Sequence, residues 1–180
     1  MIHVLAAVIR TGNQILLARR PDHVHQGGLW EFPGGKKEGP ESREAALKRE
    51  LIEEIGIEPT GYRPLIQVPH EYTDKSVLLD VWEVSSWRGI AHGKEGQPIQ
   101  WVTIDGLRQY QFPQANLAII KAVQLPSHYL ITPAMNGGEA EFMAQLEASL
   151  SSGITLVQYR QKNLPQNTFA NLSTKVILCC

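Results

Sequence analysis

Three glutamates lie close together in the first third of the chain and could hold a hard metal cation. Glu50, Glu53 and Glu54 occur near the end of a segment, 42–55, whose residues favour a helix. Side chains three and four residues apart share one face of a helix, so we expect the three carboxylates to converge. Oxygen ligands suit Mg²⁺, or Mn²⁺, better than zinc. The spacing therefore predicts a magnesium site, although a solvated acidic face is the commoner source of an isolated Glu-x-x-Glu-Glu pattern.

The residues around these glutamates match a longer pattern at every fixed position. The pattern is Gly-x5-Glu-x7-Arg-Glu-aliphatic-x-Glu-Glu-x-Gly-aliphatic, and it is filled by Gly35, Glu41, Arg49, Glu50, Leu51, Glu53, Glu54, Gly56 and Ile57. This stretch resembles the Nudix box, the signature of a family of Mg²⁺-dependent hydrolases. The resemblance implies four metal ligands, which are the carboxylates of Glu50, Glu53 and Glu54 and the carbonyl of Gly34. We also expect Arg49 to pair with Glu41 and to orient the metal-binding carboxylates.

The same segment carries the signals of an ordinary helix. Ser42 is a suitable N-cap, and Gly56 suits the position after the helix, where the chain often turns left-handed. The apolar residues that should face the core are Ala45, Ala46, Leu47, Leu51, Ile52 and Ile55. Pro40 stands where relatives usually have the glycine before the glutamate, so we expect the loop to turn at Gly39 instead.

The resemblance extends well beyond the box. Residues 1–125 resemble the MutT branch of the Nudix family, the pyrophosphohydrolases that destroy oxidised nucleoside triphosphates. The landmarks that carry it are Arg19-Arg20, His25, the run from Trp30 to Gly35, the run from Gly93 to Pro98, Trp101, and Phe112-Pro113 followed by Ala115-Asn116. The residues that this resemblance places around the nucleotide are Arg20, His25, Glu31, Phe32, Pro33, Gly34, Lys75 and Asn116. It implies 8-oxo-dGTP, a small-molecule nucleotide, as the substrate.

The chemistry of these side chains suits a nucleotide pocket. Asn116 carries both a donor and an acceptor, so it can read a purine edge in two directions. Phe32 offers a face or an edge to a base. Lys75 stands where relatives have arginine, and it keeps the charge but loses the planar fork. Each residue taken alone has an ordinary alternative, namely Arg20 as a surface charge, Asn116 as a helix cap and Phe32 as part of the core.

Glu95 lies in a glycine-rich loop, Gly93-Lys-Glu-Gly96, far from the helix in sequence. A glutamate in such a loop is usually solvated, but in the MutT branch the matching residue approaches the metal and is a candidate general base. We predict that water attacks the triphosphate while the metal neutralises charge, and that Glu95 or a helix glutamate accepts the proton. The predicted catalytic residues are Glu54, Glu50, Glu95 and Arg49. The resemblance implies attack at the β-phosphorus.

The composition is that of an ordinary soluble protein, with 180 residues and a net charge of −1. No basic excess points to nucleic-acid binding. The apolar N-terminal run is interrupted at Arg10, too early for a signal core or a membrane span. The cysteines, Cys179 and Cys180, are adjacent, which disfavours a structural disulfide or a zinc site and favours a reduced compartment. We expect a cytoplasmic monomer without membrane or nucleic-acid partners.

The periodicity of apolar residues predicts an α/β domain over residues 1–125. The expected strands are 2–10, 13–19, 28–33, 62–71, 76–85 and 98–103, and the expected helices are 42–55 and 115–124. Mixed strands with two helices predict an α/β/α sandwich around a mixed sheet, which is the fold that the Nudix resemblance implies.

Composition changes near residue 125, and only six charged residues fall within 126–180. Expected strands and helices alternate there, at 128–132, 138–150, 154–160 and 166–178, an order typical of parallel strands with crossovers. The segment resembles the start of thiamine phosphate synthase, a (β/α)₈ barrel, with the pyrophosphate-binding pattern at Gln158, Arg160 and Lys162. A closed barrel needs about 200 residues or more. We therefore interpret 126–180 as an incomplete TIM-barrel type segment, truncated or decayed, without synthase activity.

Three functions compete on this evidence. Hydrolysis of 8-oxo-dGTP, which protects the nucleotide pool and replication fidelity, agrees best with Asn116. A pyrophosphohydrolase of a thiamine-related diphosphate is suggested by the second segment. A nucleotide sensor without catalysis would be expected to lack metal ligands, and none is missing from the box.

Overall fold

The computed structural model describes residues 1–73 and 75–180, so Asp74, beside the predicted nucleotide contact, lies outside the described residues. The chain divides into two compact units, 1–124 and 125–180. Each unit has an apolar core of its own.

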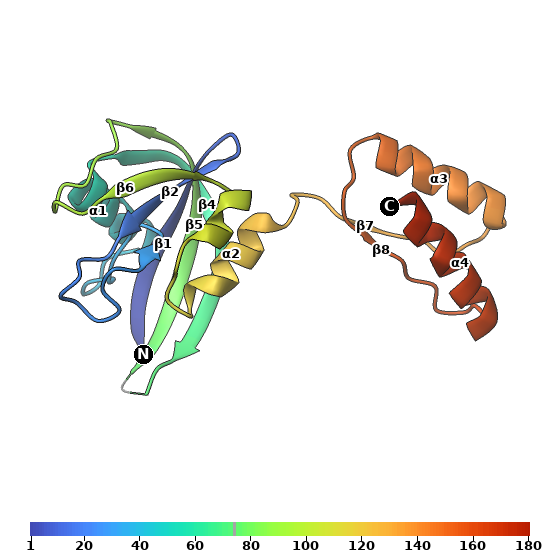
Figure 1. Ribbon diagram of the computed structural model, residues 1–180, viewed down its shortest axis with the longest axis horizontal. Helices are drawn as coiled ribbons and strands as arrows, with labels where there is room; N and C mark the ends of the chain where they lie inside the picture. Colours follow the sequence, from blue (N-terminus) through green and yellow to red (C-terminus); the bar gives the residue numbers. More distant parts are fainter. Residues whose placement is uncertain (74) are drawn as a thin grey trace. The chain divides into compact units, whose positions relative to one another are not determined.

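A six-stranded mixed sheet forms the centre of the first unit (Figure 1). Its strands are β1 (Ile2–Thr11), β2 (Gln14–Arg19), β3 (Trp30–Glu31), β4 (Glu58–Glu71), β5 (Ser76–Arg88) and β6 (Ile99–Thr103). The strand order is β3-β2-β1-β5-β4, and β6 pairs with β2. β1 and β5 run parallel, whereas the other pairs of this sheet are antiparallel. The predicted mixed sheet is thus confirmed.

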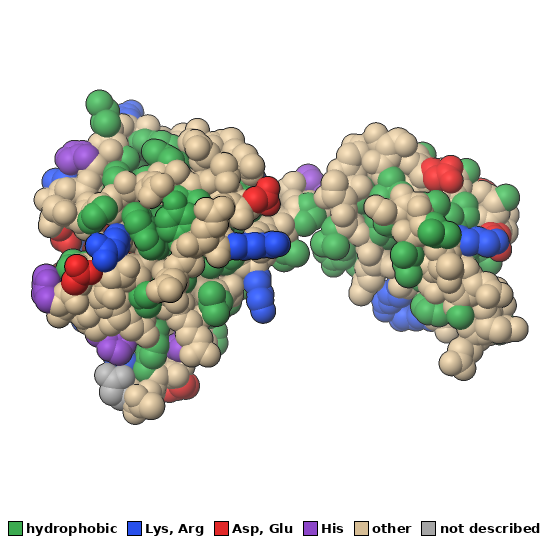
Figure 2. Space-filling model, in the orientation of Figure 1, with side chains coloured by type: hydrophobic (Ala, Val, Ile, Leu, Met, Phe, Trp, Pro, Cys, Tyr) green, Lys and Arg blue, Asp and Glu red, His purple; other side chains and the backbone are tan. Residues whose placement is uncertain are grey.

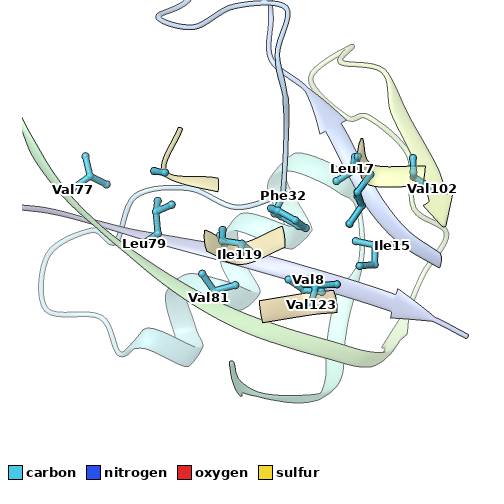
Figure 3. Close-up of a cluster of buried hydrophobic side chains, with 13 residues drawn as sticks. Val8, Ile15, Leu17, Phe32, Val77, Leu79, Val81, Val102, Ile119 and Val123 are labelled. Carbon is cyan, nitrogen blue, oxygen red and sulfur yellow. The ribbon is translucent and has the colours of Figure 1, made fainter. Parts of the chain in front are cut away.

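Helices cover both faces of this sheet. One face packs against α1 (Arg43–Ile55) and the other against α2 (Asn116–Gln124) and the short 3₁₀ helix η1 (Asp105–Gln109). Because successive side chains of a strand point to opposite faces, β1 serves both cores. Its residues facing α1 are Leu5, Ala7 and Ile9, and those facing α2 are Ala6 and Val8. Figure 3 shows the α2 side of the core, with Val8, Ile119 and Val123 close together. The α/β/α arrangement agrees with the prediction.

α1 begins and ends where its capping residues predict. The Ser42 hydroxyl accepts a hydrogen bond from the Ala45 N–H at 3.1 Å, and Gly56 adopts φ +71°. The residues of α1 that are fully buried are Ala46, Leu47, Leu51 and Ile55. Burying a leucine side chain stabilises a fold by about 1.5–3 kcal/mol. This face therefore fixes α1 on the sheet and leaves its glutamates outside the apolar core.

Two residues of α1 depart from the predicted buried face. Ala45 is exposed, and Ile52 is 42% exposed. Each follows or precedes a buried residue directly, so it lies about 100° around the helix from that residue. The buried stripe is narrower than the apolar pattern predicts.

The second unit is a small βαβα segment. Its elements are β7 (Leu130–Ile131), α3 (Glu139–Ser151), β8 (Val157–Gln158) and α4 (Gln166–Cys179). β7 and β8 pair in parallel, as predicted. Both strands are much shorter than predicted, because a two-stranded sheet has no outer neighbours to extend the ladder. The core consists of Phe142, Leu146, Leu172 and Val176.

Apolar side chains remain on the surface of the second unit, seen in green in Figure 2. Ile177 is 73% exposed and Leu178 is 82% exposed. Among the described residues, no helix combines the length and the apolar character needed to cross a membrane.

Candidate active site

A tight turn beside β1 forms the floor of the candidate site. The chain at 33–35 runs along β1, where the Ala7 N–H donates to the Pro33 carbonyl at 2.8 Å and the Leu5 N–H donates to the Gly35 carbonyl at 2.8 Å. Gly34 lies between these two contacts with φ +149°. A Cβ at Gly34 would lie 2.1 Å from the Leu5 carbonyl oxygen. Only glycine allows this close approach of two backbone segments.

Two carboxylates of α1 lie against this turn. The Gly34 N–H donates to Glu54 Oε2 at 2.7 Å. A Cβ at Gly35 would lie 2.1 Å from Glu50 Oε2, so the carboxylate fills the space that a side chain at position 35 would need. In the part of the chain that the structure describes, no hydrogen bond reaches the Gly34 carbonyl, although both neighbouring carbonyls accept from β1. The turn thus gathers two carboxylates and one unused carbonyl oxygen.

The three glutamates of the box do not share one set of partners in this structure. Within residues 1–73 and 75–180, no group of three or more acidic, histidine or cysteine side chains is arranged to hold a metal ion. Glu53 is 57% exposed and turns toward Arg49, whereas Glu54 turns toward the Gly34 N–H. Glu50 and Glu53 both accept from Arg49 Nη1, whereas Glu54 has a separate donor in the Gly34 N–H. Helical spacing places these residues on one face but does not fix their side-chain torsions.

Arg49 connects the carboxylates around the turn. It donates two hydrogen bonds to Glu41, at 2.8 and 3.2 Å, and one each to Glu50 at 2.9 Å and Glu53 at 3.1 Å. A further hydrogen bond reaches the Lys36 carbonyl at 3.0 Å. The Arg49 hydrogen bonds, together with the Glu38 N–H, lower the pKa of Glu41 to about 2. The predicted pairing of Arg49 with Glu41 is present.

The site concentrates negative charge away from water. Burial raises the pKa of Glu54 to about 7, the Gly34 N–H opposes that rise, and the Glu31 and Glu95 carboxylates add to it. Burial also raises the pKa of Glu50, against the hydrogen bond from Arg49. Such desolvated oxygen donors are the environment that a hard divalent cation stabilises. The residues therefore fit Mg²⁺ or Mn²⁺ in their chemistry.

The loop that carries Glu95 is fastened to the end of α1. The Lys94 N–H donates to the Glu54 carbonyl at 2.9 Å, and Lys94 Nζ donates to the Ile52 carbonyl at 2.9 Å. A positive charge at this end also complements the helix dipole. Glu95 therefore lies near enough to raise the pKa of Glu54. The structure thus ties this loop to residues of α1 some forty positions earlier, and the role of Glu95 as a base stays a prediction.

A second polar group lies around Arg20. Its guanidinium forms an ion pair with Glu31 and donates to the His25 carbonyl at 3.0 and 3.2 Å. Burial raises the pKa of Glu31, and the charge and hydrogen bond of Arg20 reduce that rise. The Glu31 carboxylate also raises the pKa of Glu54 by charge repulsion, so this group adjoins the carboxylates of α1. Arg20 is thus not a simple surface charge.

Tyr72 belongs to the same neighbourhood, although the sequence did not single it out. Its ring meets the His25 ring edge-on with centroids 5.9 Å apart. Lys75 Nζ lies 5.8 Å from the centre of the Tyr72 ring, and the Tyr72 N–H donates to the Lys75 carbonyl at 2.8 Å. Tyr72 therefore links Lys75 to His25. An aromatic residue three positions before a predicted nucleotide contact was the available signal.

Phe32 is packed into the core, whereas the side chain of Asn116 forms no hydrogen bond within the described residues. Phe32 is 3% exposed and stacks on Phe112 with centroids 6.0 Å apart, so it belongs to the core of Figure 3 and offers a ligand little surface. Asn116 opens α2 and is 8% exposed. No hydrogen bond of its side chain is seen within the described residues, so the structure gives no support to a capping role. The polar atoms of this amide are not fully buried, so they are available to a ligand.

The predicted anion-binding pattern of the second unit lies beside a cavity of about 420 Å³. Arg160 and Lys162 line this cavity, together with Thr132 and Asn136. Gln158, the first residue of the pattern, does not line it. The resemblance of this unit to thiamine phosphate synthase stays a prediction.

Comparison with known proteins agrees with the geometry of the first unit. Residues 4–122 match the model of the NUDIX domain. The 8-oxo-dGTP diphosphatase of Escherichia coli K12 is 38% identical over 120 residues, which are 66% of this chain and 93% of that protein. The CTP pyrophosphohydrolase of the same organism is 38% identical over 122 residues, 68% of this chain and 90% of that protein.

Solved structures resemble the same residues. A chain from a study of MutT from Aliivibrio salmonicida and Vibrio cholerae is 41% identical, with a TM-score of 0.60, and the match covers 68% of this chain and 95% of that one. The MutT Nudix hydrolase of Burkholderia pseudomallei is 25% identical, with a TM-score of 0.64 over 68% of this chain and 98% of that one. The family model spans well over half of the chain, and the chain therefore belongs to the NUDIX-domain family and is a Nudix hydrolase.

Proposed function

We propose that this protein hydrolyses 8-oxo-dGTP to 8-oxo-dGMP and pyrophosphate and so protects the nucleotide pool. The observation that carries the proposal is the placement of Glu50 and Glu54 against the Gly34–Gly35 turn. The similarity to proteins named 8-oxo-dGTP diphosphatase supports the choice of substrate. The protein would act as a cytoplasmic monomer, without binding nucleic acid.

Mg²⁺, with Mn²⁺ as an alternative, would be held by the carboxylates of Glu50, Glu53 and Glu54 and the carbonyl of Gly34. The unused Gly34 carbonyl and the two carboxylates beside it support this set. When bound, the cation neutralises phosphate charge and acidifies water. Glu53, being exposed, can turn inward without breaking the core.

The side chains of this site divide the remaining work. Water adds to the β-phosphorus, and the bond from that phosphorus to the bridging oxygen of the α-phosphate breaks. Glu54 or Glu95 accepts the proton of the attacking water. Arg49 keeps Glu50 and Glu53 in position.

The nucleoside would lie toward Arg20 and Asn116. Arg20, His25, Glu31 and Lys75 form one group of polar contacts, with Tyr72 between its members. Pro33 and Gly34 give the backbone floor, and the neighbouring Phe32 is buried in the core. The unpartnered amide of Asn116 suits a purine that presents both a donor and an acceptor.

A second candidate substrate is CTP, because a CTP pyrophosphohydrolase is as similar to this chain as the 8-oxo-dGTP diphosphatase. A pyrimidine is smaller than a purine and presents a different set of donors and acceptors to Asn116. The two substrates are therefore separable by kinetics.

The deciding experiment is steady-state hydrolysis of 8-oxo-dGTP, dGTP, CTP and thiamine diphosphate, with and without Mg²⁺. We expect kcat/KM for 8-oxo-dGTP to exceed the others by about a hundredfold, equivalent to about 2.7 kcal/mol of transition-state binding. Asn116→Ala should remove most of that preference while CTP hydrolysis stays unchanged. A preference for CTP or thiamine diphosphate would contradict the substrate, and activity without a divalent cation would contradict the metal site.

A further inference from the structure

A buried glutamine connects the loop of Glu95 to the end of α1. Gln97 is 9% exposed, and its amide uses both polar atoms. Nε2 donates to the Glu54 carbonyl at 2.9 Å, and the Glu95 N–H donates to Oε1 at 3.0 Å. These partners fix the orientation of the amide, because a carbonyl only accepts and an N–H only donates. One side chain therefore joins the backbones of the two proposed proton acceptors.

The Glu54 carbonyl, which accepts from Gln97, depends on the loop for its hydrogen bonds. The Glu54 carbonyl is among the last four of the helix, which have no partner within it. The loop supplies two donors, Gln97 Nε2 and the Lys94 N–H, each at 2.9 Å. A buried carbonyl left without a donor costs about 1–3 kcal/mol. The helix end and the loop thus stabilise each other.

The loop itself is folded closely onto Gln97. A Cβ at Gly93 would lie 1.9 Å from the Gln97 carbonyl oxygen, so any larger residue there would displace the strand start. Gly96 adopts φ +80°, a conformation that glycine accepts readily. The Gly96 N–H donates back to the Gly93 carbonyl at 3.2 Å. The position of Gln97 relative to Glu95 is therefore set by a tight turn.

We propose that Gln97 is a positioning residue that sets the separation between the Glu95 and Glu54 carboxylates. The inference rests on the proposed function, because it requires that Glu95 takes part in hydrolysis. Glutamine alone meets both demands at this distance. A glutamate lacks the donor, an asparagine is one methylene shorter, and a methionine of similar volume offers neither contact.

The test is a double-mutant cycle with Gln97→Met and Glu95→Gln in the full-length protein, measuring kcat and KM for 8-oxo-dGTP at saturating Mg²⁺. We expect Gln97→Met to lower kcat about tenfold. We expect it to leave KM within about twofold, since it acts on the reacting end only. In the Glu95→Gln background the same substitution should change kcat by less than about twofold, because the residue it positions is already inactive.

The outcomes separate this inference from the function on which it rests. Equal losses in both backgrounds, or full activity of Gln97→Met, overturn the role of Gln97. Full activity of Glu95→Gln overturns the role of Glu95 and this inference with it. If Gln97→Met fails to fold by circular dichroism, Gln97→Asn, which stays polar but cannot reach both partners, takes its place in the cycle.

Lys94→Met provides the matched control. Its Nζ binds the Ile52 carbonyl at 2.9 Å, so this variant removes another tether between the loop and α1 without touching the Glu95 N–H. We expect its kcat to stay within about twofold of the wild type. A loss as large as that of Gln97→Met would show that any loosening of the loop lowers activity, and would overturn a specific role for Gln97.

Discussion

Arg49 holds three glutamates with one side chain. Its guanidinium donates to Glu41, Glu50 and Glu53. Arginine presents five donors in a fixed plane, whereas lysine presents three on one rotating atom. The placement of the carboxylates therefore depends on the shape of the arginine as well as on its charge.

Replacing Arg49 by lysine should weaken metal binding more than it slows the chemical step. Lysine cannot reach Glu41, Glu50 and Glu53 together, so we expect the Mg²⁺ concentration for half-maximal activity to rise about 10- to 100-fold. A magnesium titration of the hydrolysis rate measures this. Lys48→Met is the control, since Lys48 lies over the Tyr62 ring and not at the turn. An unchanged titration curve for Arg49→Lys would show that the planar guanidinium is not needed to hold the three glutamates for metal binding.

Replacing Glu54 by glutamine should abolish most activity and leave the fold intact. We expect kcat to fall by at least about a hundredfold, because the variant loses a proposed metal ligand and a candidate base. The glutamine oxygen can still accept from the Gly34 N–H, so the unfolding midpoint should not fall. Turnover near that of the wild type would contradict the assignment of Glu54 as a metal ligand.

At the residue scale, the sequence predicts which face of a helix a side chain is on, but not the torsion angles that decide which partner it reaches. Glu50, Glu53 and Glu54 lie outside the buried apolar stripe of α1, as the box spacing predicts. It could not show that Glu54 turns to the Gly34 N–H, because that donor lies 20 residues away in sequence. Asn116 was ambiguous for the same reason, since a cap and a ligand contact need the same residue type.

At the scale of elements, Asp80 ties α1 to the sheet. It is fully buried on β5, and it accepts hydrogen bonds from Arg43 at the start of α1 and from His3 on β1. Arg43 also lies over the Trp82 ring, 5.0 Å from its centre. Burial acts to raise the pKa of Asp80, but these hydrogen bonds outweigh it, so its pKa lies below the ordinary value.

The stability of the protein should therefore depend on Asp80 at acid pH. A carboxyl with a lowered folded pKa stabilises the protein above its unfolded pKa, near 3.9, and loses that contribution as the pH falls through the folded value. We expect the unfolding midpoint to fall more steeply for the wild type than for Asp80→Asn as the pH drops below about 4. At pH 7, Asp80→Asn should be less stable by about 1–3 kcal/mol.

Thermal unfolding between pH 5 and pH 3 measures this difference. Asp105→Asn is the control, since Asp105 is exposed. Parallel curves for the wild type and Asp80→Asn would mean that Asp80 has no special share in acid stability.

Elements with strong local signals were predictable, and short ones were not. α1 was bounded correctly because Ser42 and Gly56 cap it. η1 was missed, since a 3₁₀ segment of five residues carries too little periodicity to be recognised. The strands of the second unit were overestimated because their length depends on neighbours that the apolar pattern cannot reveal.

At the scale of the whole molecule, the hydrolase site and both large cores lie within residues 1–124. The 120 residues aligned with the E. coli 8-oxo-dGTP diphosphatase make up 93% of that protein, so the relative consists almost entirely of the first unit. The second unit has its own, smaller core.

A chain of residues 1–124 should therefore retain the activity of the full protein. We expect kcat/KM for 8-oxo-dGTP to agree within about twofold, because the two cores share no side chains. Steady-state kinetics on both chains measures this. A loss beyond tenfold in a chain that still unfolds cooperatively would show that 125–180 contributes to the site.

β1 has a consequence for how this protein can change by insertion and deletion. The N–H groups of Leu5 and Ala7 hold the Gly34–Gly35 turn, and the side chains of the same two residues face α1. Removing one residue from β1 would exchange its two faces and shift the turn at once. Length variation among descendants of this chain should therefore be absent from β1 and frequent at the exposed residues 125–129. A library of single-codon deletions would reveal that contrast. Each variant would be scored by whether it lowers the mutation rate of a bacterial strain that lacks its own 8-oxo-dGTP diphosphatase.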